Sequence, residues 1–325
     1  MTNRYRIIIA CLLFSACASR SGDYQAIEGF TLGTTFRIVY EGVPPAAVQA
    51  GIDSVLEQID HALSVYNPQS IISKVNRNEA VMVDSFFTAV FRRSYEIYLE
   101  TDGAFDISAS PLFNAWGFGF TDREMMTQAK VDSLKQFSGM HHVRLEGARI
   151  VKDDPRVTLN ANAIAKGFGV DRVALFLEQS GSRNYLVEIG GEVRCKGKNA
   201  EGKDWAIGID KPLDGNMFPG EHLQTVVRLT DKALATSGNY RQYYEENGKK
   251  YAHTIHPATG YPVAHNLLSA TVLAGDCMTA DAYATAFMVV GLEGAQQLLA
   301  AHPELGAYLI YEHQGKLCVY EREGN

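Results

Sequence analysis

The chain has 325 residues, of which 46% are hydrophobic and 21% charged, an ordinary globular composition that excludes a collagenous, low-complexity or wholly disordered chain. The net charge of −7 and an isoelectric point near 5.7 argue against a protein that binds nucleic acid through phosphate attraction. Beyond the N-terminus, no apolar stretch approaches the roughly 20 residues of a membrane-spanning helix.

The N-terminus has the pattern of an export signal. Arg4 and Arg6 precede the apolar run 7–14, and Ser15-Ala16-Cys17 follows, which resembles a bacterial lipobox. The pattern predicts a signal peptide over residues 1–16, a lipid on Cys17 and a tether over 17–27. Cleavage there would change the net charge from −7 to −9. Cys11 also fits locally, with a much shorter apolar run before it, and a plain signal peptide with an incidental cysteine is the other alternative.

The predicted elements mix helices and strands. Apolar periodicity predicts helices over 45–66, 85–100, 163–179 and 278–290. Strands are predicted over 30–40 (with a bend), 142–145, 149–151, 185–189, 205–210, 225–229 and 268–274. Hairpins are predicted over 240–255 and 308–320, turning at Asn247-Gly248 and Gln314-Gly315. Without steady strand–helix alternation, we expect an α+β fold, one compact unit over residues 28–325.

Besides Cys17, three cysteines remain for the folded domain after cleavage: Cys195, Cys277 and Cys318. An odd, widely spaced set without a C-x-x-C motif is neither a disulfide framework nor a zinc site. We expect them to be buried small apolar residues.

Two of four candidate segments have the glycines and charges of a ligand site. Residues 102–119 contain Asp106, which could accept hydrogen bonds from a flat ligand; a turn with buried aromatics explains them equally well. Residues 160–171 place Lys166 at a predicted helix start, where anions bind. A glycine-rich helix start with a solvated lysine is the alternative, and the order of a P-loop is absent.

The other two segments offer histidines and oxygen ligands. His253 and His256 follow the segment 235–240 and could act as acid or base, although their spacing disfavours a shared zinc. Asp281 and Thr285 are four apart on a predicted helix and would share one face, which suits Mg²⁺. For each histidine, the alternative is a structural, hydrogen-bonded side chain. For Asp281 and Thr285, the alternative is an aspartate in the first turn of a helix and a threonine whose hydroxyl is already hydrogen-bonded.

Taken together and in this order, these segments resemble the ApbE family of FAD:protein FMN transferases. The resemblance runs from Leu32 to Gly291 and includes 32–36, 63–66, 70–76, the block 103–119, the helix start at 163–167, 188–192, 235–240, 253–262 and 280–285. It implies a periplasmic enzyme, lipid-anchored at Cys17, that binds FAD and a divalent cation (Mg²⁺, or Mn²⁺) in a cleft between two subdomains. The FMN part is moved to a threonine, and AMP is released.

The resemblance also implies roles for particular residues. Flavin or nucleotide contacts fall at Leu32, Tyr66, Ala104, Phe105, Asp106, Asn160, Lys166 and Ile255. Asp281 and Thr285 match the side-chain metal ligands, and Ala163 supplies a backbone carbonyl. The catalytic residues are Asp281 and His253, which would assist removal of the threonine proton. His256 and Asn160 stand where acids are usual in the family, which argues against a general base at either position.

The implied acceptors are flavoprotein subunits of membrane redox complexes with an acidic-small-Ala-Thr-type motif. The sequence leaves open a metal-dependent FAD pyrophosphatase, in which water attacks instead, and a non-catalytic FAD-binding lipoprotein. A solute-binding partner of a transporter would need two similar lobes, and no internal repeat supports them.

Overall fold

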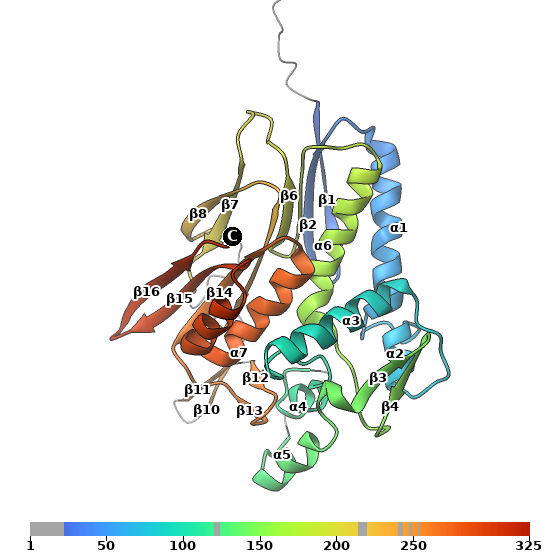
Figure 1. The fold of residues 1–325 in the computed structure, drawn as a ribbon, viewed down its shortest axis with the longest axis vertical. Coiled ribbons are helices and arrows are strands. Elements are labelled where there is room, and N and C mark those ends of the chain that lie inside the picture. The colour runs from blue at the N-terminus through green and yellow to red at the C-terminus, as the bar shows by residue number, and fades with distance from the viewer. Residues whose placement is uncertain (1–22, 120–123, 214–219, 240–242, 247–248, 253) are drawn as a thin grey trace, which may run out of the picture.

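The computed structural model describes residues 23–119, 124–213, 220–239, 243–246, 249–252 and 254–325. Its centre is a sheet of eight strands in the order β1-β2-β5-β6-β9-β14-β15-β16, all neighbours antiparallel (Figure 1). These strands are β1 (Tyr24–Thr31), β2 (Thr34–Glu41), β5 (Tyr185–Ile189), β6 (Glu192–Lys196), β9 (Lys232–Gly238), β14 (Leu267–Ala274), β15 (Gly306–His313) and β16 (Lys316–Arg322). An antiparallel sheet with helices gathered on it confirms the predicted α+β class.

The two faces of this sheet are covered differently. One face packs against helices in the main hydrophobic core, to which β2, β5, β9 and β14 contribute alternate residues. The helices are α1 (Pro45–Leu63), α2 (Ile71–Asn76), α3 (Ser85–Glu100), α6 (Asn162–Gln179) and α7 (Cys277–Ala301). On the other face, Val193 and Cys195 of β6 pack against Trp205 and Ile207. The covering element is the hairpin of β7 (Trp205–Asp210) and β8 (Leu223–Leu229).

Short elements gather at one end of the molecule, the lower end in Figure 1. They are α4 (Ser110–Ala115), α5 (Gln128–Lys135), the 3₁₀ turn η1 (Met140–His142), β3 (Val143–Glu146), β4 (Arg149–Lys152), β10 (Tyr243–Glu246), β11 (Lys249–Ala252), β12 (Ile255–His256) and β13 (Tyr261–Pro262). A small core joins α4 and α5 to β12, and the Trp116 indole N–H donates to the Gly260 carbonyl oxygen at 2.8 Å. Segments more than 100 residues apart in sequence therefore meet at this end.

The predicted strand over 30–40 is instead a hairpin of β1 and β2. Leu32 and Gly33 have φ angles of 49° and 75° and reverse the chain, and Thr31 pairs with Thr34. Because β1 begins at Tyr24, residues 24–27 belong to the sheet and not to the predicted tether. The signal peptide, Cys17 and the rest of the tether lie outside the described residues.

The last long helix extends beyond its predicted end. The prediction ended it at Val290, and α7 continues to Ala301 across a break at Gly291, whose φ is 73°. A Cβ at Gly291 would lie 2.9 Å from Cδ2 of His265, so glycine serves both the backbone angle and the close contact. Among the residues that the structure describes, no helix is long and apolar enough to span a membrane.

The three cysteines of the folded part are free thiols. Cys195 and Cys277 are buried, as predicted, whereas Cys318 on β16 is only half-buried. The prediction for Cys318 was wrong because β16 forms an edge of the sheet.

Candidate active site

The start of α6 lies against the first turns of α7. A Cβ at Gly167 would be 2.3 Å from the carbonyl oxygen of Cys277 and 2.8 Å from Cβ of Asp281, so the approach requires glycine. The Gly167 amide donates a 3.0 Å hydrogen bond to Oδ2 of Asp281. The Asp281 side chain is thereby held at the contact between the two helices, where the residue is only 4% exposed.

The three predicted metal ligands lie on these adjacent helices. Asp281 and Thr285 are one turn apart on α7, and Ala163 is in the first turn of α6. In a regular helix the Gly167 N–H would donate to the Ala163 carbonyl, and its bond to Asp281 competes with that interaction. A carbonyl oxygen has two lone pairs, so the Ala163 oxygen could also contact a cation.

A carboxylate, a hydroxyl and a carbonyl are hard oxygen ligands, so this set fits Mg²⁺. The Thr285 hydroxyl also lies 3.4 Å from that of Ser237 on β9, which brings the segment 235–240 to the same place. In the described part of the chain, no group of three or more His, Cys, Asp or Glu side chains could hold a metal. A metal here would therefore depend on the mixed oxygen set and on phosphate oxygens or water.

Lys166, whose side chain is half-buried, forms an ion pair with the buried Glu192, the first residue of β6. Burial lowers the pKa of Lys166, but the carboxylates of Glu192 and Asp281 outweigh burial and raise it to about 12. Lys166 is therefore charged at neutral pH. It provides the positive charge that the sequence predicted for a phosphate contact.

Glu192 is the site residue that the sequence patterns missed. It is 2% exposed, and its Oε2 has no hydrogen-bond partner among the residues that the structure describes. Burial raises the pKa of this carboxyl, while the neighbouring Lys166 acts in the opposite direction. Segment 188–192, which contains Glu192, belonged to the family resemblance without a role for this carboxylate, and only the packing of β6 against α6 shows that it meets Lys166.

Asp106 and Asn160 lie on two segments that are joined by backbone contacts. The Asn160 amide donates to the Ile107 carbonyl oxygen at 2.7 Å, and Asn160 Oδ1 accepts from the Asn162 amide at 2.9 Å. Asp106 Oδ1 accepts from the amide and the hydroxyl of Ser108, at 2.8 and 2.6 Å. Burial raises the pKa of Asp106 to about 6.

Tyr66 reaches the start of α6 from the turn that follows α1. Its ring is 72% exposed, and its hydroxyl accepts a hydrogen bond from Asn162 Nδ2 at 3.3 Å. Leu32, in the β1–β2 turn, lies beside Gly169 of α6, where a Cβ would be 3.4 Å from its Cδ1. The predicted contacts at Tyr66, Leu32 and Lys166 thus border the same helix.

Three other predicted contacts have side chains in the core. Ala104 and Phe105 are 4% and 1% exposed, and Ile255 is fully buried among residues of α4 and α5. A ligand could meet these positions only through their backbone atoms. His253 lies outside the described residues. Burial, followed by the nearby His265, lowers the pKa of His256, so its imidazole is neutral at pH 7.

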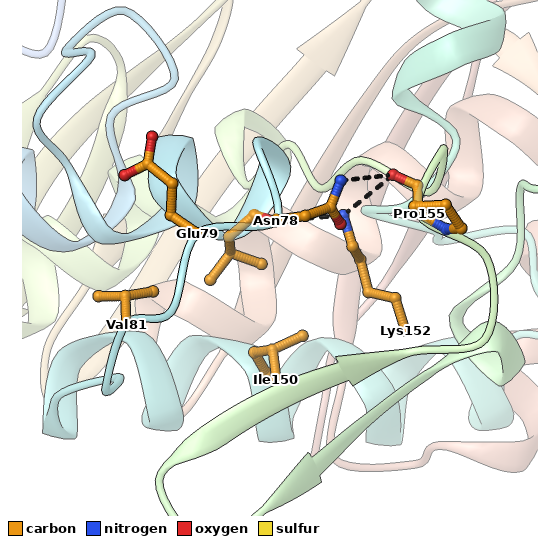
Figure 2. Close-up of a pocket in the computed structure, with 7 residues that line it drawn as sticks. Asn78, Glu79, Val81, Ile150, Lys152 and Pro155 are labelled. Atoms are coloured by element: carbon orange, nitrogen blue, oxygen red, sulfur yellow. Dashed lines mark hydrogen bonds between the residues drawn. The ribbon is translucent and has the colours of Figure 1, made fainter.

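Two cavities lie away from these residues. One, of about 240 Å³, is lined by Val75, Asn78, Glu79, Val81, Ile150, Lys152 and Pro155 (Figure 2). There Asn78 Nδ2 and Lys152 Nζ both donate to the Pro155 carbonyl, at 3.0 and 3.4 Å, and Lys152 also donates to the carbonyls of Val75 and Val157. With its ammonium group directed to three carbonyls, Lys152 cross-links the chain.

The second cavity, of about 270 Å³, is lined by Phe168, Asp171, Arg172, Leu175, Glu178, Arg194, Asp276 and Met278. Neither cavity is lined by a residue that was predicted to contact the flavin. The cleft between two subdomains therefore stays a prediction.

Comparison with known proteins places the chain in a family. The sequence model of the ApbE family matches residues 32–309, and the chain belongs to this family. It is 36% identical over 305 residues to the FAD:protein FMN transferase of Vibrio cholerae, covering 91% of this chain and 90% of that protein. It is 37% identical over 320 residues to the FAD:protein FMN transferase of Haemophilus influenzae, with coverages of 94% and 91%.

Solved structures agree with this placement. The flavin transferase ApbE of Vibrio cholerae superposes with a TM-score of 0.83 at 34% identity, covering 92% of this chain and 97% of that one. The apo form of the flavinyl transferase ApbE of Pseudomonas stutzeri gives a TM-score of 0.84 at 28% identity, with coverages of 92% and 95%. The predicted family is confirmed.

Proposed function

We propose that this protein transfers the FMN moiety of FAD to a threonine hydroxyl of an acceptor protein and releases AMP. The single observation that carries the proposal is the placement of Asp281, Thr285 and Ala163 on two touching helices, with the charged Lys166 beside them. Its relatives of similar length are named FAD:protein FMN transferase. A protein that only stored FAD would not need a divalent-cation site next to the positively charged Lys166.

The bond changes are those of an in-line displacement at phosphorus. The acceptor threonine Oγ forms a bond to the FMN-side phosphorus of FAD, the bond from that phosphorus to the bridging oxygen breaks, and AMP leaves with that oxygen. The threonine proton goes to a base, for which His253 is our candidate because imidazole titrates near neutral pH.

The residues of this chain supply position and charge. Asp281, Thr285 and the Ala163 carbonyl would hold Mg²⁺ or Mn²⁺, which when bound would neutralise charge on phosphate oxygens. Lys166 stays protonated beside Glu192 and would add a second positive contact to the phosphates. Asp106 and the backbone at Ala104, Phe105 and Ile255 would orient the flavin.

We also propose that the mature protein is anchored by a lipid on Cys17 at the periplasmic side of a bacterial membrane. The basic, apolar and small-residue order of residues 3–17 supports this. Acceptors would be flavoprotein subunits of membrane redox complexes, which an anchored enzyme could reach from the same side.

The test is a transfer assay with purified protein, FAD, Mg²⁺ and an acceptor domain that carries a candidate threonine. We expect a covalently fluorescent acceptor band, AMP in equal amount, and FMN on the threonine by mass spectrometry. Asp281→Ala should lower the rate by more than about 100-fold, because even groups that only orient metal ligands typically contribute roughly 10–100-fold.

The control is Glu293→Gln, an exposed acid later on the same helix, which should leave the rate unchanged. Full activity of Asp281→Ala would refute the metal assignment. Release of free FMN and AMP without labelled acceptor would identify a pyrophosphatase, and bound FAD without AMP would identify a binding protein.

A further inference from the structure

The first turn of α7 is held by a side chain from α6. The first amides of any helix have no partner inside it. In α7, Asp276 accepts the Thr279 amide at 2.8 Å, as a local N-cap does. The two preceding amides donate to Asp171 of α6: Cys277 to Oδ1 at 2.9 Å and Met278 to Oδ2 at 2.8 Å.

Asp171 is itself held from the sheet. Arg194 of β6 pairs with its Oδ1 at 2.7 Å, and the two side chains are 28% and 13% exposed. The carboxylate thus joins three elements at one point: β6 through Arg194, α6 through its own backbone, and α7 through two amides. A negative charge at a helix N-terminus also interacts favourably with the helix dipole.

This point lies next to the predicted metal ligands. Asp281 follows Cys277 by one helical turn and Thr285 by two, while Ala163 precedes Asp171 by eight residues on α6. The two helices also meet at Gly167, whose amide bonds Asp281. The Asp171 contact and the Gly167 contact lie at different positions along the two helices, and together they prevent one helix from rotating or sliding on the other.

We propose that Asp171 is a positioning residue for the metal ligands, because its carboxylate fixes the first turn of α7 against α6. Asp281 and Thr285 then stay within reach of the ion that the Ala163 carbonyl contacts. This inference rests on the proposed function. The role of Asp171 is indirect, because its carboxylate contacts Arg194 and backbone amides and not the side chains of the proposed ligands.

The test compares Asp171→Asn with Glu178→Gln in the full mature protein. Asparagine replaces one of the two carboxylate oxygens with an NH2 group, which can only donate, so it loses one of the two helix amides. Glu178 is a matched control because it lies on the same helix and also ties it to the sheet, through Tyr185 at 2.6 Å and Lys196 at 3.1 Å. These two contacts do not involve α7.

Magnesium binding is measured as the rise in Tm with increasing Mg²⁺ concentration at a fixed FAD concentration. A ligand that binds the folded state raises stability by mass action. Transfer is measured over the same Mg²⁺ range. In Asp171→Asn we expect the half-saturating Mg²⁺ concentration to rise about 10-fold, the typical effect of losing a group that orients metal ligands. At saturating Mg²⁺ the transfer rate should return to within about 3-fold of the unmodified protein, and Glu178→Gln should keep the unmodified midpoint.

A midpoint within twofold of the unmodified protein in Asp171→Asn, or an equal shift in Glu178→Gln, would overturn the proposal. If circular dichroism shows that Asp171→Asn is unfolded, Asp171→Glu decides instead: it keeps the charge but displaces it by one methylene, and its midpoint should also rise. Failure of the proposed function looks different. The unmodified protein would then show no Mg²⁺ effect, or Asp281→Ala would bind Mg²⁺ normally, whatever Asp171→Asn does.

Discussion

Asp106 shows what burial does to one carboxyl group. Its Oδ1 accepts two hydrogen bonds from Ser108, which lower the pKa, but burial outweighs them and raises the pKa from 3.8 to about 6. A carboxyl group whose pKa is higher in the folded than in the unfolded state favours folding most when it is protonated. Its contribution to stability is therefore present below pH 4 and is lost as the pH rises towards 6.

Asp106→Asn should remove this pH dependence. The amide oxygen can keep both bonds from Ser108, so the fold is preserved. A shift of about two pKa units corresponds to at most about 3 kcal/mol, and the fall in unfolding free energy between pH 4 and 7 should shrink by up to that amount. Urea denaturation at several pH values measures it.

Burial also raises the pKa of Asp171, to about 6, and that of Glu192, so some slope should remain in Asp106→Asn. Asp53→Asn, at an exposed position on α1, is measured alongside as the substitution control. An unchanged slope in Asp106→Asn would show that Asp106 does not titrate in this range.

The contact of α6 with α7 is the decisive feature among the secondary structure elements. It brings the predicted metal ligands together, and it depends on the missing side chain at Gly167. Alanine normally favours a helix over glycine by about 1 kcal/mol. Here its Cβ would meet the Cys277 carbonyl at 2.3 Å, and backbone cannot move aside as a flexible side chain can.

Gly167→Ala is therefore expected to destabilise the protein by about 1–3 kcal/mol, the usual effect of overpacking. It should also weaken Mg²⁺-dependent transfer, because Asp281 must shift. Thermal unfolding and the transfer assay measure the two effects. Gly275→Ala is the matched control: Gly275 directly precedes the N-cap of α7, and a Cβ there meets no atom within 4 Å. Equal effects of both substitutions would contradict the packing argument.

For the whole molecule, the proposed lipid on Cys17 would decide how the protein is attached to a membrane. The edge strand β1 begins at Tyr24, seven positions after Cys17, so a lipid on Cys17 would hold the sheet close to the bilayer. Acyl chains contribute about 0.8 kcal/mol per buried methylene group, which makes a multiply acylated protein a stable membrane protein.

Cys17→Ser should abolish incorporation of labelled fatty acid and move the protein from the membrane fraction to the soluble fraction of bacterial cells. Cys11→Ser is the matched control and should retain both properties. If Cys11→Ser loses the label instead, the lipid is on Cys11. If the unmodified protein takes up no label, the N-terminus is a plain signal peptide.

Local patterns predicted most elements well. The helix Ser85–Glu100 was predicted with its bounds, because its apolar period is strong and Asp84 caps it. The turn at Gln314-Gly315 was confirmed, with φ angles of 51° and 73° that suit a tight hairpin. The strand Lys232–Gly238 was missed, because its small residues show no alternation and its place is set by pairing with β6 and β14.

The sequence by itself determined the family and the fold class, and it singled out Asp281, Thr285, Lys166 and Asp106 as candidate site residues, because these inferences depend on residue type, order and helical spacing. Tertiary structure decided that Glu192 is buried against Lys166, that Asp171 holds the first turn of α7, and that Phe105 and Ile255 belong to the core. Burial and pairing arise between segments that are distant in sequence, and no local periodicity encodes which carboxylate will meet which partner.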